Sequence, residues 1–64
     1  MKTVRDVVEA YLLASLCNSV TGDNGRTIQN QGYEDGEGPF WAYDENGEPV
    51  GSMPLWEAMN YIGL

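Results

Sequence analysis

The 64-residue chain has no histidine, one lysine and one cysteine. These side chains are the usual bases and nucleophiles near neutral pH, so neither a catalytic triad nor an activated thiol can be assembled. Carboxylates are numerous, but a general acid needs a buried site, and a chain this short buries only about 60% of the surface that it exposes when unfolded. The sequence therefore predicts a protein that is not an enzyme and uses no cofactor.

Disulfides and long apolar runs are also missing. The single cysteine, Cys17, cannot form a bridge within the chain, whereas small secreted domains normally depend on such bridges. The longest apolar run, residues 10–17, is far shorter than the roughly 20 residues of a membrane-spanning helix. Asp6 and Glu9 stand where a secretion signal would carry positive charge. We therefore expect a cytoplasmic protein with no membrane segment.

Positive charge is scarce: Lys and Arg number 3 against 10 Asp and Glu, which gives a net charge of −7. Such a chain is repelled by nucleic acids and by anionic lipid, so direct binding to either is excluded. Calcium loops starting at Asp23 or Asp44 also fail, because Gly25 and Pro49 stand where the EF-hand pattern needs an oxygen ligand and a glycine. The sequence predicts no metal site and favours a basic protein surface as partner.

The first segment has the pattern of an amphipathic helix over residues 4–18. Thr3 and Asp6 form a variant of the capping box that starts such a helix. Residues at helical spacing predict a core-facing stripe: Val4, Val7, Val8, Tyr11, Leu12, Ala14 and Ser15. Leu13, flanked by Ala10 and Cys17, lies on the opposite face and predicts a contact between two copies of the chain.

The second half has the pattern of a small antiparallel sheet of two or three strands. Residues 26–31 predict a short strand, and the glycine-rich, acidic residues 32–38 predict a solvated loop. Asn46-Gly47 between two apolar runs predicts a hairpin with a two-residue turn, in which Tyr43 opposes Val50 and Glu45 opposes Glu48.

The two faces of this hairpin differ in the size of their side chains. One face would carry Trp41, Tyr43 and Val50, and we expect it to meet the helices because a small core needs large side chains. The other face would then leave Phe40 and Met53, a cross-strand pair, available to a partner.

The last segment predicts a short helix that starts near Ser52 or Met53, with Pro54 in its first turn and Gly63 after its end. Its apolar stripe comprises Leu55, Ala58, Met59 and Ile62. The whole chain, residues 1–64, therefore predicts one α+β domain, in which an N-terminal helix and a short C-terminal helix cover one face of the sheet.

Charge is segregated along the chain, since residues 1–26 are neutral and residues 27–64 contain seven acids and no Lys or Arg. Acids and apolar anchors of this kind predict a partner-binding surface. Its members are Glu34, Asp35, Glu37, Phe40, Asp44, Glu45, Glu48 and Met53.

Our leading hypothesis is a protein-binding module that docks on a basic groove of a nucleic-acid-handling protein and blocks it as a nucleic-acid mimic. This profile is similar to that of the small inhibitors that phages and other mobile elements encode against host enzymes, although no individual residue carries the likeness. The alternative is a homo-oligomeric structural or small-ligand-binding protein, in which Ala10, Leu13 and Cys17 form a dimer contact and the acids serve only solubility.

Overall fold

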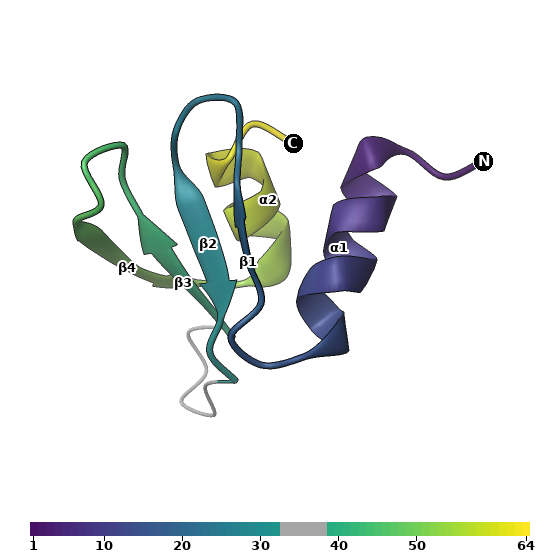
Figure 1. The fold of residues 1–64 in the computed structure, drawn as a ribbon, viewed down its shortest axis with the longest axis horizontal. Helices are drawn as coiled ribbons and strands as arrows, with labels where there is room; N and C mark the ends of the chain where they lie inside the picture. The colour runs from purple at the N-terminus through teal and green to yellow at the C-terminus, as the bar shows by residue number, and fades with distance from the viewer. Residues whose placement is uncertain (33–38) are drawn as a thin grey trace.

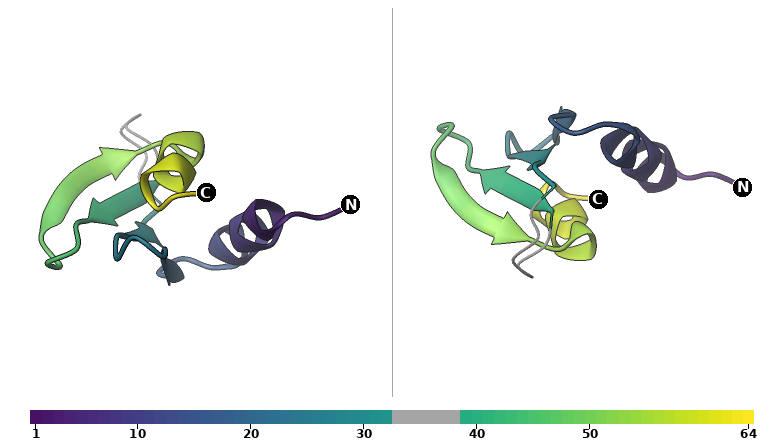
Figure 2. Two further views of the ribbon diagram at one scale, coloured as in Figure 1. Left: turned by 90° about the horizontal axis from the view of Figure 1, so that it is seen from above. Right: turned by 90° about the horizontal axis from the view of Figure 1, so that it is seen from below.

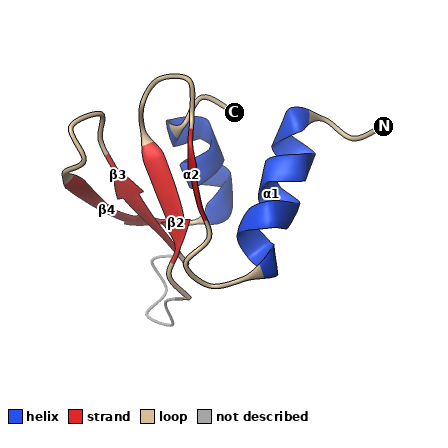
Figure 3. Ribbon diagram, in the orientation of Figure 1, coloured by secondary structure: helices blue, strands red, loops and turns tan. Residues whose placement is uncertain are grey.

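The computed structural model describes residues 1–32 and 39–64 (Figure 1). The elements, in chain order, are α1 (Val4–Ala14), β1 (Ser19–Thr21), β2 (Thr27–Asn30), β3 (Phe40–Tyr43), β4 (Pro49–Met53) and α2 (Leu55–Tyr61). Neighbouring strands pair antiparallel in the order β1-β2-β3-β4 (Figure 3). The α+β architecture with a helix at each end is confirmed, but the sheet has four strands in the described residues rather than two or three.

The additional strand, β1, arises from a hairpin between residues 19 and 30 that was not predicted from the sequence. Gly22 donates its N–H to the carbonyl of Arg26 at 2.9 Å, and Gly25, at a φ of 83°, donates to the carbonyl of Gly22. A type I turn followed by a left-handed glycine is the usual three-residue hairpin loop. Asn24-Gly25 is thus a second Asn-Gly hairpin signal, which sequence reasoning missed.

The β3–β4 turn has the same geometry, so the predicted two-residue turn is wrong. Asp44 and Glu48 close a three-residue loop through an N–H···O=C bond of 2.9 Å, and Asp44 Oδ1 accepts from the N–H groups of Asn46 and Glu48. These bonds stabilise a type I turn, in which only Gly47 needs a positive φ. Glu45 therefore does not oppose Glu48, and Tyr43 pairs with Pro49 instead of Val50.

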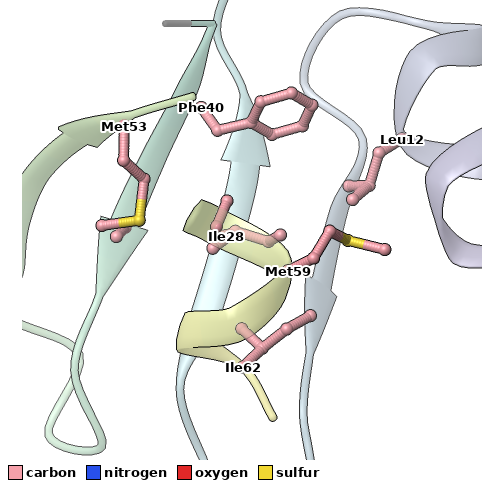
Figure 4. Packing of buried hydrophobic residues seen from close by; sticks show 8 residues of the cluster. Leu12, Ile28, Phe40, Met53, Met59 and Ile62 are labelled. Carbon is pink, nitrogen blue, oxygen red and sulfur yellow. The ribbon is translucent and has the colours of Figure 1, made fainter. Parts of the chain in front are cut away.

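The hydrophobic core lies between the helices and one face of the sheet, and Figure 4 shows its packing. Its buried residues are Leu12 from α1, Ile28, Phe40, Ala42 and Met53 from the sheet, and Ala58, Met59 and Ile62 after β4. The predicted orientation of the hairpin is therefore wrong, because Phe40 and Met53 face the helices while Val50 is exposed. The small Ala42 is fully buried in the middle of the sheet and leaves room for α2. The face that carries Trp41 and Tyr43 would not leave that room, because its side chains are larger.

Helix α1 begins at the predicted capping box, where Thr3 and Asp6 exchange hydrogen bonds of 3.0 and 3.1 Å. It ends at Ala14 rather than 18, because side-chain amides take its last carbonyl groups. Asn18 donates to the carbonyl of Tyr11, and the buried Asn30 donates to that of Leu12 at 2.9 Å. An asparagine amide that caps a carbonyl replaces the next helical N–H and so ends the helix.

The predicted core stripe of α1 is only partly correct. Leu12 is fully buried and Val8 is half-buried, as expected. Val4, Val7 and Tyr11, however, are exposed to 69%, 57% and 51%. The body of the protein contacts a narrow strip of this helix and leaves the rest of its apolar surface in water.

Helix α2 has the predicted stripe, with Ala58, Met59 and Ile62 buried, and Gly63 follows its end at a φ of 92°. Its N-cap is Pro54 rather than Ser52 or Met53, with no side-chain cap. The β1–β2 turn lies close to the end of α2, since a Cβ atom at Gly22 would lie 2.0 Å from the carbonyl oxygen of Ile62. Neither helix among the described residues is both long and apolar enough to cross a membrane.

Candidate interaction surface

The β1–β2 and β3–β4 turns lie at the same end of the sheet and contact each other. Arg26 Nε is 3.3 Å from Glu45 Oε1, and this ion pair joins the two turns. We call residues 22–26 and 44–48 the turn end. It holds four acids and one arginine, and the acids are Asp23, Asp44, Glu45 and Glu48. The turn end therefore carries a net charge of −3.

These four carboxylates differ in the hydrogen bonds and ion pairs that they form within the protein. Asp44 is half-buried and accepts two main-chain N–H bonds of 2.9 and 3.0 Å, so it holds the turn in shape. Glu45 is exposed and pairs with Arg26. Asp23 and Glu48 are exposed. The last two are therefore the carboxylates best placed to meet an external cation.

Both arginines of the chain are used inside the molecule, at the C-terminal end of α2. Arg5 donates to the main-chain oxygen of Leu64 at 2.7 Å and to Asn60 Oδ1 at 3.2 Å. Arg26 donates to the carbonyl of Tyr61 and lies 4.7 Å from the centre of its ring. Cations stabilise the negative end of a helix dipole and stack on aromatic rings. Lys2, exposed near the start of α1, is the remaining basic side chain.

Two aromatic side chains lie on the outer face of the sheet along β3, the strand that leads into the turn end. Trp41 and Tyr43 alternate with the buried Phe40 and Ala42, so they point away from the core, and both are half-buried. Tyr43 directly precedes Asp44 in the chain. We define the outer hairpin surface as Trp41, Tyr43, Asp44, Glu45 and Glu48. The alternation of Trp and Tyr was visible in the sequence, but it was assigned to the core.

Two of the predicted partner anchors are not available to a partner. Phe40 is fully buried and Met53 is 7% exposed, because this cross-strand pair fills the space beneath the helices, so their proposed role is wrong. The other predicted acids, Glu34, Asp35 and Glu37, lie outside the described residues. Asn30 and Phe40, which pair at the border of that segment, lie at the end of the sheet opposite to the turn end.

The three residues predicted for a dimer contact do not share one helical face. Ala10, Leu13 and Cys17 are all exposed, as expected. Helix α1 ends at Ala14, however, and Cys17 lies beyond it at a φ of 70°, with its N–H bonded to the carbonyl of Asn30. Only Ala10 and Leu13 therefore remain on the helix.

A shallow groove of about 160 Å³ lies between α1, β1 and the end of the chain. Its apolar walls come from Val4, Val8, Val20, Ile62 and Leu64. Pockets for small molecules are typically about 300–1,000 Å³, so this groove is too small to favour a small ligand. No group of three or more Cys, Asp or Glu residues within the described ranges is arranged to hold a metal ion.

Comparison of the chain with protein-family models, with curated proteins and with solved structures finds no match.

Proposed function

We propose that this protein is a non-enzymatic binding module whose outer hairpin surface docks on a basic surface of another protein. The observation that carries the proposal is the placement of three carboxylates, Asp44, Glu45 and Glu48, in the turn that follows the strand carrying Trp41 and Tyr43, while both arginines are engaged at the end of α2. Uncompensated surface charge accelerates encounter with a partner of opposite sign. Aromatic side chains that lose water on contact contribute most of the affinity.

The partner that fits this surface is a protein that holds phosphates in a basic groove, such as a cytoplasmic nucleic-acid-handling enzyme. Carboxylates at the turn end would take the place of phosphates, and the aromatic rings would cover the apolar floor of the groove. The protein would then act as a nucleic-acid mimic and inhibit the enzyme, in the manner of the small inhibitors of phages and mobile elements. Competition with nucleic acid is the signature of this mode of binding.

The charge contribution is tested on the partner captured from cell lysate at low salt. Asp23→Asn with Glu48→Gln removes two negative charges from the turn end without touching the bonds of Asp44 or the Arg26–Glu45 pair. Glu9→Gln with Glu57→Gln removes the same charge from the helices and is the matched control. We expect the turn-end variant to associate severalfold more slowly, with little change in dissociation, and the control to associate almost as the parent does.

The aromatic contribution is tested by Trp41→Ser, which we expect to accelerate dissociation because a buried aromatic contact is lost. Excess nucleic acid should displace the parent protein from its partner, and raised salt should weaken the complex. Failure to capture a partner at either salt would exclude the proposal, as would equal slowing by the control variant. The triple change Glu34→Gln, Asp35→Asn, Glu37→Gln tests the acids outside the described residues in the same assay.

A further inference from the structure

Helix α1 carries a second apolar stripe that the body of the protein does not cover. Val4, Val7, Tyr11 and Ala14 are all exposed, and they follow one another at intervals of three, four and three residues. At about 100° per residue, these positions fall within an arc of about 80° on the helix. The same spacing forms the contact between helices in a coiled coil. We call these four residues the α1 seam.

No charged side chain of α1 lies on this seam. Arg5 is turned toward α2, where it contacts Leu64 and Asn60. Asp6 bonds back to Thr3, and Glu9 follows on the side of the helix opposite to the seam. A charge-free apolar face does not select a basic or an acidic partner, but it is complementary to an identical face.

For two associating copies, the charge distribution of the molecule favours contact through α1 over contact through the acidic second half. Residues 1–26 are neutral, whereas residues 27–64 carry the net charge of −7. Figures 1 and 2 show α1 and the β3–β4 hairpin on opposite sides of the molecule. Two copies that meet through α1 therefore keep their acidic hairpins apart, whereas contact through any acidic region would bring like charges together.

We propose that two copies of this chain associate through the α1 seam, with Val4, Val7 and Tyr11 packed against the same residues of the second copy. Ala10 and Ala14, both small, allow the two helices to approach closely. An eleven-residue helix is about 16 Å long, so the contact is smaller than the roughly 800 Å² per partner of a standard interface. The dimer is accordingly weak and forms at micromolar or higher concentration.

This assignment differs from a contact through Leu13. On the helix, Leu13 lies between Glu9, four residues earlier, and Asp6, seven residues earlier. A symmetric contact there would bring these acids of both copies together, whereas no acid of α1 lies on the seam, and Asp23 lines the groove beside Val4 at one end of it. Leu13, at 55% exposed, and Val7, at 57%, are otherwise matched in exposure. Glutamate at each position therefore makes a matched pair of variants.

The test is sedimentation equilibrium of the parent, Val7→Glu and Leu13→Glu from about 10 μM to about 1 mM, a range that spans weak dimers. We expect the mass of the parent and of Leu13→Glu to rise from 7.1 kDa toward twice that value, and Val7→Glu to remain at the monomer mass. Circular dichroism checks that each variant is folded. Dilution of the labelled parent should shift the amide resonances of Val4, Val7 and Tyr11 most.

Salt distinguishes this contact from docking through the outer hairpin surface. Raised salt screens the repulsion between two chains of net charge −7, so it should strengthen self-association, whereas it should weaken binding to a basic partner. A parent that stays monomeric at 1 mM in high salt would overturn the inference. So would dissociation by Leu13→Glu with Val7→Glu still dimeric. Neither result would affect partner binding by the hairpin.

Discussion

The two helices are anchored to the sheet in different ways. Helix α2, with seven residues, buries Ala58 and Met59, and Ile62 at its C-cap is buried as well. Helix α1, with eleven residues, buries only Leu12. Both arginines bind main-chain oxygens at the end of α2, whereas the end of α1 is held by Asn18 and Asn30. The shorter helix, α2, is thus part of the hydrophobic core, whereas the longer helix, α1, contributes one buried side chain to it.

This difference shows that the amount of apolar surface on a helix does not determine how much of it is buried. Helix α1 has more apolar side chains than one strip of contact can cover, so several of them remain exposed. Helix α2 buries Ala58 and Met59 of its apolar stripe and leaves Trp56, at 62% exposed, outside it. Stability and association are therefore expected to depend on different helices, and substitutions in each can test that separation.

The largest effect is expected from Met59→Ala in α2. Met59 is fully buried, and a large-to-small change at such a site leaves a cavity and costs about 2–5 kcal/mol of unfolding free energy. Val7→Ala in α1 is the control, with an expected loss below about 0.5 kcal/mol because the side chain is exposed. Urea unfolding at low protein concentration, followed by tryptophan fluorescence, measures both. A comparable loss in the two variants would contradict the difference between the helices.

A smaller effect is expected from Asn30→Ala, which removes the side-chain amide that donates to the buried carbonyl of Leu12. An unsatisfied buried acceptor costs about 1–3 kcal/mol. Asn18→Ala should cost less, because the bond from Asn18 to the carbonyl of Tyr11 is exposed and water can replace it. Urea unfolding compares the two variants, and hydrogen exchange locates the change in α1. Equal losses would show that burial does not distinguish the two caps.

The β3–β4 turn provides a reference that involves neither helix. Gly47 has a φ of 81° and open space around its Cβ position, so Gly47→Val adds backbone strain without a clash. We expect a loss of somewhat more than about 1 kcal/mol, since a β-branched residue is forced into the left-handed region. Gly47→Asn should lose less, because asparagine tolerates that region. If thermal unfolding shows no difference between the variants, the turn does not hold this geometry in solution.

The smallest effect is expected from Thr3→Ala at the start of α1. Loss of an N-cap typically costs about 1 kcal/mol, but the first turn of α1 contributes little to the core, so the global loss should fall below that value. Amide exchange in the first turn of α1 should accelerate more than global unfolding does. A global loss well above 1 kcal/mol would show that the start of α1 is tightly coupled to the core.

Structural features that depend on a local sequence signal were predicted correctly. Three such features are confirmed: the Thr3–Asp6 capping box, the apolar stripe of α2, and the placement of Gly47 in a turn at a positive φ. Each depends on a few neighbouring residues. The faces of β3 could not be predicted in this way, because Phe40 and Ala42 alternate with Trp41 and Tyr43 and both pairs are apolar. Only the packing of α2 distinguishes them.

The same limit applies to α1 and to the outer hairpin surface. Apolar residues cover more than half of the circumference of α1, so its spacing alone could not show which strip meets the body. The acids at 44, 45 and 48 were correctly placed at a hairpin turn, but the bonds of Asp44 and the Arg26–Glu45 pair depend on contacts between distant residues. Phe40 and Met53 were wrongly predicted to contact a partner, because the opposite face of β3 was expected to meet the helices.

The close approach of Gly22 to Ile62 has a consequence for the range of sequences that this fold accepts. Any Cβ atom at position 22 would overlap the main chain at the end of α2, so every substitution there should be selected against in a saturation library. At position 47 only the backbone angle is restrictive, and a library should retain asparagine and aspartate beside glycine. The residues recovered at these two positions would therefore distinguish steric overlap, which excludes every side chain at position 22, from a positive φ, which excludes only some side chains at position 47.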